Sequence, residues 1–296
     1  MAMNKLYTLL TGLMFAAFVA EAKLIAYEPF DYDDGNGETL EGSNTGFGWG
    51  GEFPAWTLTA PTTDTTASPS LKRHNAYTNG VVQYDFSYTD ANGLSVSTHG
   101  NVYARFTDAN RTGSNWENIV AKRTFAETNV LATGESIWMS ILAMQHDTYQ
   151  DANQVFFYLM TPNRNNDTWS ITGAQHGSTL RWGIRTTNAL KGHTNAPHPV
   201  NVAIPMFIIV QVQMTGATTA TVRAWINPPD MSTAAALGAP SMSKTGLTSV
   251  TPQFYGFVVN THKRRALSFD ELRIGTTLRS VINGEIPPLA TLLFSR

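Results

Sequence analysis

The sequence predicts an all-β protein built from two antiparallel sheets packed face to face. Runs in which apolar and polar residues alternate recur along most of the 296-residue chain. Turn-forming clusters such as residues 33–37 and 89–93 separate these runs. No amphipathic segment of helical length lies between them, which excludes the βαβ units of a parallel sheet.

The elements follow from these runs in chain order. The only candidate helix is short: it covers residues 231–237 and has Asp230 as its cap, after Pro228 and Pro229. We expect strands at residues 24–32, 81–86, 101–106, 136–144, 155–160, 180–186, 207–214, 220–227, 254–260 and 267–275.

Period-two alternation also assigns the two faces of these strands. In residues 207–214 and 220–227 one side is apolar, and the other side carries Gln, Arg and Trp. Residues 101–106 and 180–186 show the same division. Residues 137–144 are apolar on both sides, which predicts a central strand covered on both faces.

The N-terminal residues 1–22 have the pattern of a secretory signal peptide. Lys5 precedes an apolar run, and Ala20-Glu21-Ala22 fits the small-residue cleavage site. The run is shorter than the roughly 20 apolar residues that span a bilayer, so we expect no membrane span after the signal is removed. The sequence thus predicts a signal peptide at 1–22, one β domain at 23–283 and a tail at 284–296, in a secreted or bacterial cell-envelope protein.

Composition excludes several classes of function. Lys plus Arg total 20 and Asp plus Glu total 22, for a formal net charge of -2, which argues against a nucleic-acid partner. There is no cysteine, so disulfide scaffolds, thiol catalysis and cysteine-based zinc sites are excluded.

Several segments together resemble a known family. These are LIAYEPFDY at 24–32, GFGWGG at 46–51, SIWMS at 136–140, WINP at 225–228 and FDELRIGTT at 269–277. They are similar to the LamG-like, concanavalin A-type jelly-roll proteins exported by planctomycete and verrucomicrobial bacteria. The resemblance covers residues 24 to about 283 and implies a jelly-roll sandwich, while its motifs say little about activity.

The resemblance also implies a structural Ca²⁺. In such modules a Glu of the first strand and an Asp of the last strand often hold calcium, and Glu28 and Asp270 match those positions. Carboxylate and carbonyl oxygens are the ligands that Ca²⁺ prefers. The alternative is that Glu28 forms a salt bridge with Arg273 and that Asp270 caps a turn.

The polar side of the predicted sheet is the candidate ligand site. Sugars bind to aromatic rings through their apolar faces and to planar Arg or Gln groups through hydroxyl or acid groups. The alternative is that a second layer covers this face and that Trp225 belongs to the core. The candidate residues are Tyr103, Arg105, Arg181, Arg185, Gln211, Gln213, Arg223 and Trp225.

These observations predict a non-catalytic carbohydrate-binding or adhesion module whose partner is a polysaccharide or cell-surface glycan. Glycoside hydrolysis needs two carboxylates flanking one bond. The nearest sets do not provide them, because residues 31–34 lie in a turn and Asp270 and Glu271 alternate across a strand. A polysaccharide lyase is the alternative enzyme, and a purely structural envelope protein is the third interpretation.

Overall fold

The computed structural model describes most of the β domain. The described residues are 22–30, 41–42, 44, 46–59, 70–75, 87–97, 102–107, 118–145, 155–162, 169–176, 179–185, 193–199, 204–262 and 267–282. Residues 1–21 of the predicted signal peptide, the predicted strand 81–86 and the predicted tail 284–296 lie outside them. In the described part of the chain, no helix is long and apolar enough to cross a membrane.

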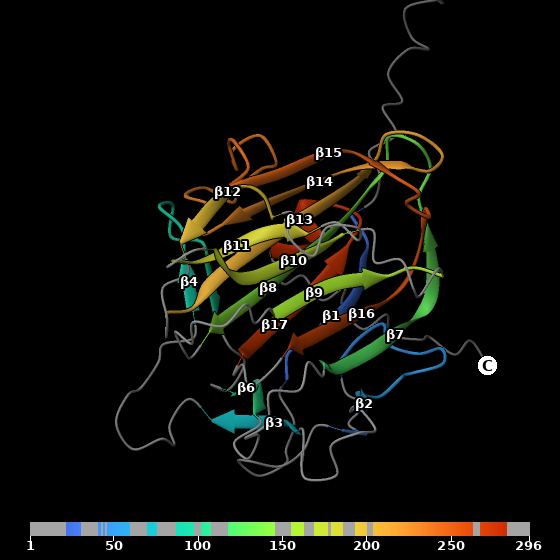
Figure 1. Ribbon diagram of the computed structural model, residues 1–296, viewed down its shortest axis with the longest axis vertical. Helices are drawn as coiled ribbons and strands as arrows, with labels where there is room; N and C mark the ends of the chain where they lie inside the picture. Colours follow the sequence, from blue (N-terminus) through green and yellow to red (C-terminus); the bar gives the residue numbers. More distant parts are fainter. Residues whose placement is uncertain are drawn as a thin grey trace, which may run out of the picture.

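Two large antiparallel sheets form the protein (Figure 1). The first sheet has the order β15 (Met242–Thr248), β14 (Thr219–Ile226), β13 (Met206–Met214), β8 (Ser136–Gln145), β17 (Leu267–Gly275), β6 (Val102–Thr107) and β3 (Ser70–Asn75), and β1 (Leu24–Glu28) also pairs with β17. The second sheet has the order β12 (His193–Pro199), β11 (Thr179–Arg185), β10 (Ser170–His176), β9 (Val155–Met160), β16 (Gln253–His262), β7 (Asn118–Val130) and β2 (Thr57–Thr59).

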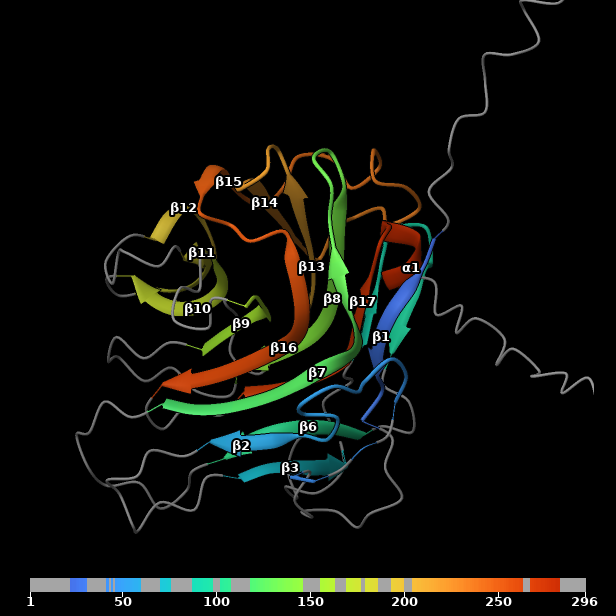
Figure 2. The ribbon, with the colours of Figure 1, turned by 90° about the vertical axis from the view of Figure 1, so that its right-hand side faces the viewer.

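The chain crosses repeatedly from one sheet to the other. Strands β7 and β8 follow each other in sequence but lie in different sheets, and so do β16 and β17 (Figure 2). The first and last strands of the domain, β1 and β17, are paired neighbours. This arrangement confirms the predicted two-sheet antiparallel jelly-roll sandwich.

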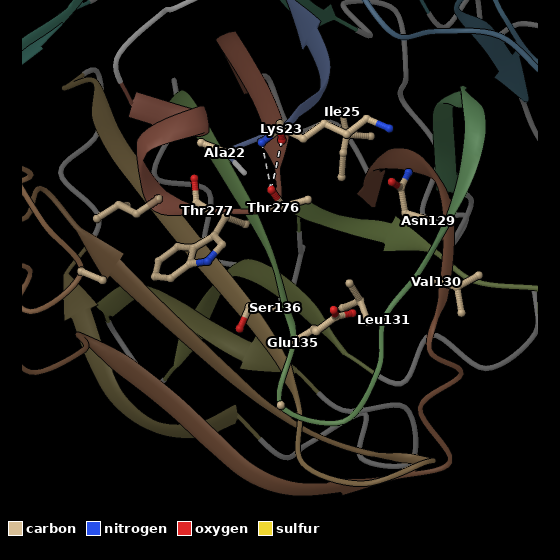
Figure 3. A pocket seen from close by; sticks show the side chains of 14 residues that line it. Ala22, Lys23, Ile25, Asn129, Val130, Leu131, Glu135, Ser136, Thr276 and Thr277 are labelled. Carbon is tan, nitrogen blue, oxygen red and sulfur yellow. Dashed lines mark hydrogen bonds between the residues drawn. The ribbon is translucent and has the colours of Figure 1, made fainter. Parts of the chain in front are cut away.

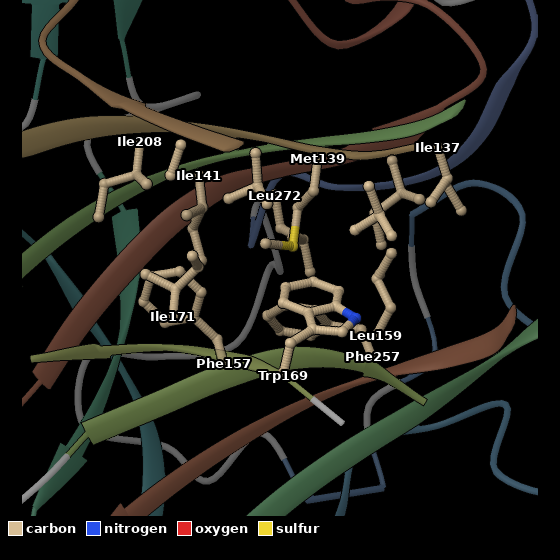
Figure 4. Close-up of a cluster of buried hydrophobic side chains, with 14 of the residues drawn as sticks. Ile137, Met139, Ile141, Phe157, Leu159, Trp169, Ile171, Ile208, Phe257 and Leu272 are labelled. Carbon is tan, nitrogen blue, oxygen red and sulfur yellow. The ribbon is translucent and has the colours of Figure 1, made fainter. Parts of the chain in front are cut away.

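The main core lies between the two sheets, where their apolar faces meet (Figure 4). Every second residue of β13 and β14 points into it, as the alternation predicts. From the first sheet come Ile208, Val210, Val212, Val222 and Ala224, and from the second Phe157, Leu159, Ile171, Trp182, Ile184, Phe257 and Val259.

A second apolar cluster covers part of the outer face of the first sheet. Leu142 and Met144 of β8 and Ile209 of β13 point into it. The hairpin of β4 (Ser87–Thr89) and β5 (Ser95–Ser97) lies over it, and so does helix α1 (Leu278–Ile282). Strand β8 is therefore buried on both faces, which confirms the prediction of a central covered strand.

The predicted helix at residues 231–237 does not form, because these residues make turns instead. The Asp230 carboxylate accepts a hydrogen bond from the Ser232 backbone nitrogen at 2.8 Å, which closes a local turn. Met231 and Leu237, at the two ends of the segment, are buried in the outer cluster. The segment therefore covers the sheet through these two buried side chains, which turns rather than a helix hold in place.

The glycine-rich segment after residue 45 joins the two sheets. Phe47 bridges to Tyr27 of β1, and Trp49 bridges to Phe125 of β7. Gly48 has a φ of 78°, and a Cβ at this position would overlap the backbone carbonyl of Ile25. Glycine is required there because only a residue without a side chain allows the two backbones to approach this closely.

A fully buried ion pair connects the sheets at the same end of the sandwich. The Glu28 carboxylate of β1 is paired with the Arg123 guanidinium of β7, and both side chains are 0% exposed. The Trp56 indole nitrogen donates to Glu28 at 3.1 Å, and Arg123 Nε donates to the Pro54 carbonyl at 2.9 Å. The pair is thus hydrogen-bonded on both sides, as buried charges require.

We expect Glu28→Gln to destabilise the protein by about 3–5 kcal/mol, because the Arg123 charge would then remain buried without its partner. Urea unfolding measures this change in the free energy of unfolding. The double variant Glu28→Gln/Arg123→Met removes both charges and should recover part of the loss.

The matched control for this prediction is Glu127→Gln. Glu127 forms an ion pair with Lys23 at 3.3 Å, with side chains 78% and 60% exposed. An exposed pair of this kind contributes at most about 1 kcal/mol. An effect of Glu28→Gln as small as that of the control would contradict the structural role of the buried pair.

Candidate functional site

The eight predicted ligand-binding residues do not share one face. Gln211 and Gln213 lie on β13, and Arg223 and Trp225 on the adjacent β14. Tyr103 and Arg105 lie on β6, which β17 and β8 separate from β13. Arg181 and Arg185 lie on β11 of the second sheet. The side chains of the residues on β6 and β11 lie outside the described part of the structure.

Trp225 is buried in the outer cluster, with 5% of its surface exposed. Its ring stacks on Trp138 of β8, with centroids 5.9 Å apart and planes 18° apart. Its indole nitrogen donates to the Gly238 carbonyl at 3.1 Å. Trp225 therefore packs inside the covered part of the outer face. The expectation that it offers its ring to a ligand has to be corrected.

The covering layer ends partway along the strands. On β13 the outward residues Phe207 and Ile209 are fully buried, whereas Gln211 and Gln213 are partly exposed. The same boundary crosses β14 between Trp225 and Arg223. Ser136, Gln211, Gln213 and Arg223 lie beyond this boundary and are partly exposed; together they form the open strip.

Hydrogen bonds join all four residues of the open strip. Arg223 Nη1 donates to Gln211 Oε1 at 2.9 Å and to Gln213 Oε1 at 3.1 Å. Gln211 Nε2 donates to Ser136 Oγ at 3.0 Å, and Gln213 Nε2 donates to the Gly134 carbonyl at 3.3 Å. The amides are thereby held with their oxygens toward the guanidinium.

A surface groove of about 920 Å³ adjoins the open strip (Figure 3). Ser136 and Gly134 belong to its wall and also to the hydrogen-bond network of the strip. One side of the groove is formed by the end of β7 and the turn into β8, and the other by the N-terminus of β1 and the end of β17. Its lining is mainly apolar, from Ile25, Val130, Leu131, Trp138, Ala234 and Leu278, with polar groups from Lys23, Asn129, Glu135, Thr276 and Thr277.

Sequence reasoning missed the groove. The pattern of residues 136–144 predicts only a strand, although the spacing of Ser136 and Trp138 places both on one side of it. The groove residues come from four separated segments of the chain. The pairing of β1 with β17 and of β17 with β8 brings three of these segments together.

The residues predicted to hold calcium are placed differently. Glu28 faces the space between the sheets and is paired with Arg123, not with Arg273. Asp270 is in register with Leu142, whose side chain packs on the outer face, and its Oδ1 accepts from the Glu271 backbone nitrogen at 2.6 Å.

These two carboxylates do not fit a shared calcium site. The described residues also include no group of three or more His, Asp or Glu arranged to hold a metal ion. Calcium binding stays a prediction, and comparing melting midpoints with and without a chelator tests it.

A buried polar cluster occupies the outer side of the β1–β17 pair. Tyr27 donates its hydroxyl to the Glu271 carboxylate at 3.1 Å, and Arg273 Nη2 pairs with the same carboxylate at 2.8 Å. The Arg273 guanidinium lies 4.6 Å above the centre of the Tyr27 ring. Burial, followed by the negative charge of Glu271, raises the pKa of Tyr27 well above its ordinary value.

This shift predicts a loss of stability at high pH. Above a pH of about 10 the phenol of Tyr27 ionises in the unfolded chain but stays protonated in the folded one, so the unfolded state binds fewer protons. The free energy of unfolding then falls by at most about 1.4 kcal/mol per pH unit through this group. Tyr27→Phe should remove that part of the slope.

Urea unfolding between neutral and alkaline pH measures the slope. The loss of the hydroxyl hydrogen bonds lowers the stability of Tyr27→Phe by a constant amount at neutral pH, so only the change in slope is diagnostic. Parallel curves for the two proteins across the alkaline range would refute the assignment to Tyr27.

The outer face of the second sheet carries the other two predicted arginines. On β11, Trp182 and Ile184 point into the core, so Arg181 and Arg185 occupy outer-face positions. The register sets Arg185 opposite Ser170 and Arg181 opposite Ala174 of β10. Strand β11, which carries these two arginines, and strand β14, which carries Arg223, belong to different sheets.

The fold and these surfaces define a β sandwich with a groove on one sheet. No protein-family model matches the sequence, and no curated protein matches it either. Solved structures similar to it include an endo-β-1,4-glucuronan lyase from Trichoderma reesei, at 11% identity and a TM-score of 0.40, covering 83% of this chain and 96% of the lyase.

Two further solved structures are similar at the same level. A β-1,3-glucanase from Mycobacterium marinum has 10% identity and a TM-score of 0.38, covering 86% of this chain and 99% of the glucanase. The globular domain of T. cruzi calreticulin has 9% identity and a TM-score of 0.42, covering 76% of this chain and 86% of that domain. Likenesses this distant say nothing about what the chain binds, so its function is argued from its own residues.

Proposed function

We propose that the protein is an exported, non-catalytic carbohydrate-binding or adhesion module of LamG-like type. Its ligand is a polysaccharide or cell-surface glycan, bound in the groove and along the open strip. The observation that supports this proposal most is the continuity of the two surfaces through Ser136 and Gly134. An apolar trough and a row of fixed polar groups then face one ligand.

Sugars have the matching chemistry. A pyranose presents C–H groups on its faces and hydroxyl groups around its rim, so it needs apolar and hydrogen-bonding surface side by side. Exposed Val130 and Ala234 supply apolar groove surface, and Ser136 and the two glutamines bonded to its wall supply polar groups at its edge. A secreted or cell-envelope location follows from the signal-like residues 1–22 and belongs to the same proposal.

A second candidate function is polysaccharide cleavage on the other sheet. The observation that favours it is the pair of positions Arg181 and Arg185 on β11, which alternate with the core residues Trp182 and Ile184. Partly exposed Tyr158 of β9 likewise lies between the core residues Phe157 and Leu159. Arginines of this kind bind the carboxylates of uronates. A lyase would reveal itself by forming unsaturated ends on a uronate polymer, which a binding module cannot do.

We expect a glycan array to show binding that Ala234→Trp weakens by about tenfold or more, which corresponds to about 1.4 kcal/mol. Ala234 is exposed and lines the groove, so a tryptophan there would occupy the space of the ligand. The array identifies the glycan, and titration with that glycan gives the change in affinity.

Ala235→Trp is the matched control. Ala235 is the next residue and is also exposed, but it is not part of the groove lining. It should leave binding unchanged. Equal effects of the two variants, or no glycan bound by the wild-type protein, would overturn the proposal.

A further inference from the structure

Among the described residues, Arg223 has no anionic partner. Arg123 pairs with Glu28, and Arg273 pairs with Glu271. The hydrogen bonds of Arg223 go only to the neutral side-chain oxygens of Gln211 and Gln213, through one nitrogen, Nη1. Its positive charge is held in position, and no carboxylate of the described structure pairs with it.

The remaining donors of Arg223 are available to a ligand. Nε and Nη2 make no hydrogen bond to the described protein, and neither is among the buried polar atoms that lack a partner, so solvent reaches both. In a guanidinium these two N–H groups are parallel and form a fork. That fork matches two oxygens of one carboxylate or one sulfate group.

The acidic side chain of the groove wall does not pair with this Nε–Nη2 fork in the described structure. Glu135, in the turn that precedes β8, is the acidic residue of the groove wall. Its Oε2 accepts a hydrogen bond from the Ala132 backbone nitrogen at 2.7 Å, which fixes the carboxylate on its own turn. No ion pair joins Glu135 to Arg223 among the described residues.

The glutamine pair makes the position of this charge well defined. Both amides are anchored at their nitrogens, by Ser136 and by Gly134, so their oxygens cannot rotate away without breaking those bonds. A preorganised guanidinium loses less side-chain entropy when it binds than a free one. The arrangement holds a cation ready beside the groove.

We infer that Arg223 forms an oxyanion subsite and that the glycan bound here is acidic, with its carboxylate or sulfate ester on the Nε–Nη2 fork. The inference rests on the proposed function, because the groove next to the fork is what binds the rest of the sugar chain. Carboxylate and sulfate present the same pair of oxygens to the fork, so the test includes both.

The test is binding of the full-length protein to dextran, dextran sulfate and polygalacturonate at low salt. We expect binding to dextran sulfate, polygalacturonate or both, and at least about tenfold weaker binding to dextran. Arg223→Met should remove that difference. Arg223→Lys keeps the charge but not the fork, and should recover only part of the affinity. Binding to one acidic polymer alone would identify its group as the ligand.

Gln213→Glu provides a second variant that keeps the size of the side chain. It places a carboxylate where the Gln213 amide oxygen contacts Arg223, so the charge becomes compensated and binding to acidic polymer should fall as in Arg223→Met. Gln253→Glu, an exposed position on the second sheet, adds the same charge elsewhere and should have no effect. Arg279→Met on α1 controls for the loss of one positive charge.

The possible failures are distinguishable. Undiminished binding of acidic polymer by Arg223→Met and Gln213→Glu, or equal losses in Arg279→Met, would overturn the oxyanion subsite. Binding of neutral dextran that Ala234→Trp blocks and Arg223→Met does not would also overturn it, while the proposed function would stand. Binding of no glycan at all would overturn both.

Discussion

The ion pair of Glu28 and Arg123 is the contact on which the relation between the two sheets depends. Glu28 belongs to β1 of the first sheet and Arg123 to β7 of the second, and neither is exposed. A lone charge at this depth would be strongly destabilising, so the two strands are stable only when packed against each other. An aromatic shell surrounds the pair: the Arg123 guanidinium lies 4.6 Å from the Trp49 ring, and Phe30 stacks on Trp56.

The ion pair fixes the position of β1. That position in turn determines the surface on the other face of the first sheet. Strand β1 extends the sheet next to β17, and α1 follows β17 directly and folds back over β8, where the Ser140 hydroxyl donates to the Val281 carbonyl at 2.6 Å. The helix and the β4–β5 hairpin cover part of the outer face. The groove and the open strip lie where this cover ends. Trp225 is buried because it lies under the cover, and Arg223 is accessible because it lies beyond it.

The sequence predicts the fold well wherever a strand has a single apolar face. The alternation in β13 and β14 identifies the inward residues correctly, because one misplaced residue would bury glutamine or arginine. Strand β7 was missed for the opposite reason: Lys122 and Arg123 interrupt the pattern, although Arg123 points inward to meet Glu28. Strand β12 was missed because Pro197 and Pro199 suggest a loop, whereas an edge strand tolerates them.

The candidate site was predictable only in part. Arg185 and Arg223 have the same sequence signature, an arginine on the polar side of an alternating strand, yet they belong to different sheets. The alternation of a strand says which residues share its face and nothing about which sheet it joins. Gln211, Gln213 and Arg223 were correctly grouped because their two strands are joined by a short connection and pair as a hairpin.

Three arginines of the described structure differ in what compensates their charge. Where Arg123 and Arg273 serve the fold, a carboxylate compensates each of them in a buried site. A carboxylate at position 211 or 213 would hold Arg223 more strongly than an amide does, since charge-assisted hydrogen bonds are the stronger kind. The amides instead fix the guanidinium through Nη1, and within the described residues no group pairs with its charge or with its Nε–Nη2 edge. Neutral acceptors at both positions are the arrangement expected for a cation that is completed by an anion from outside the protein.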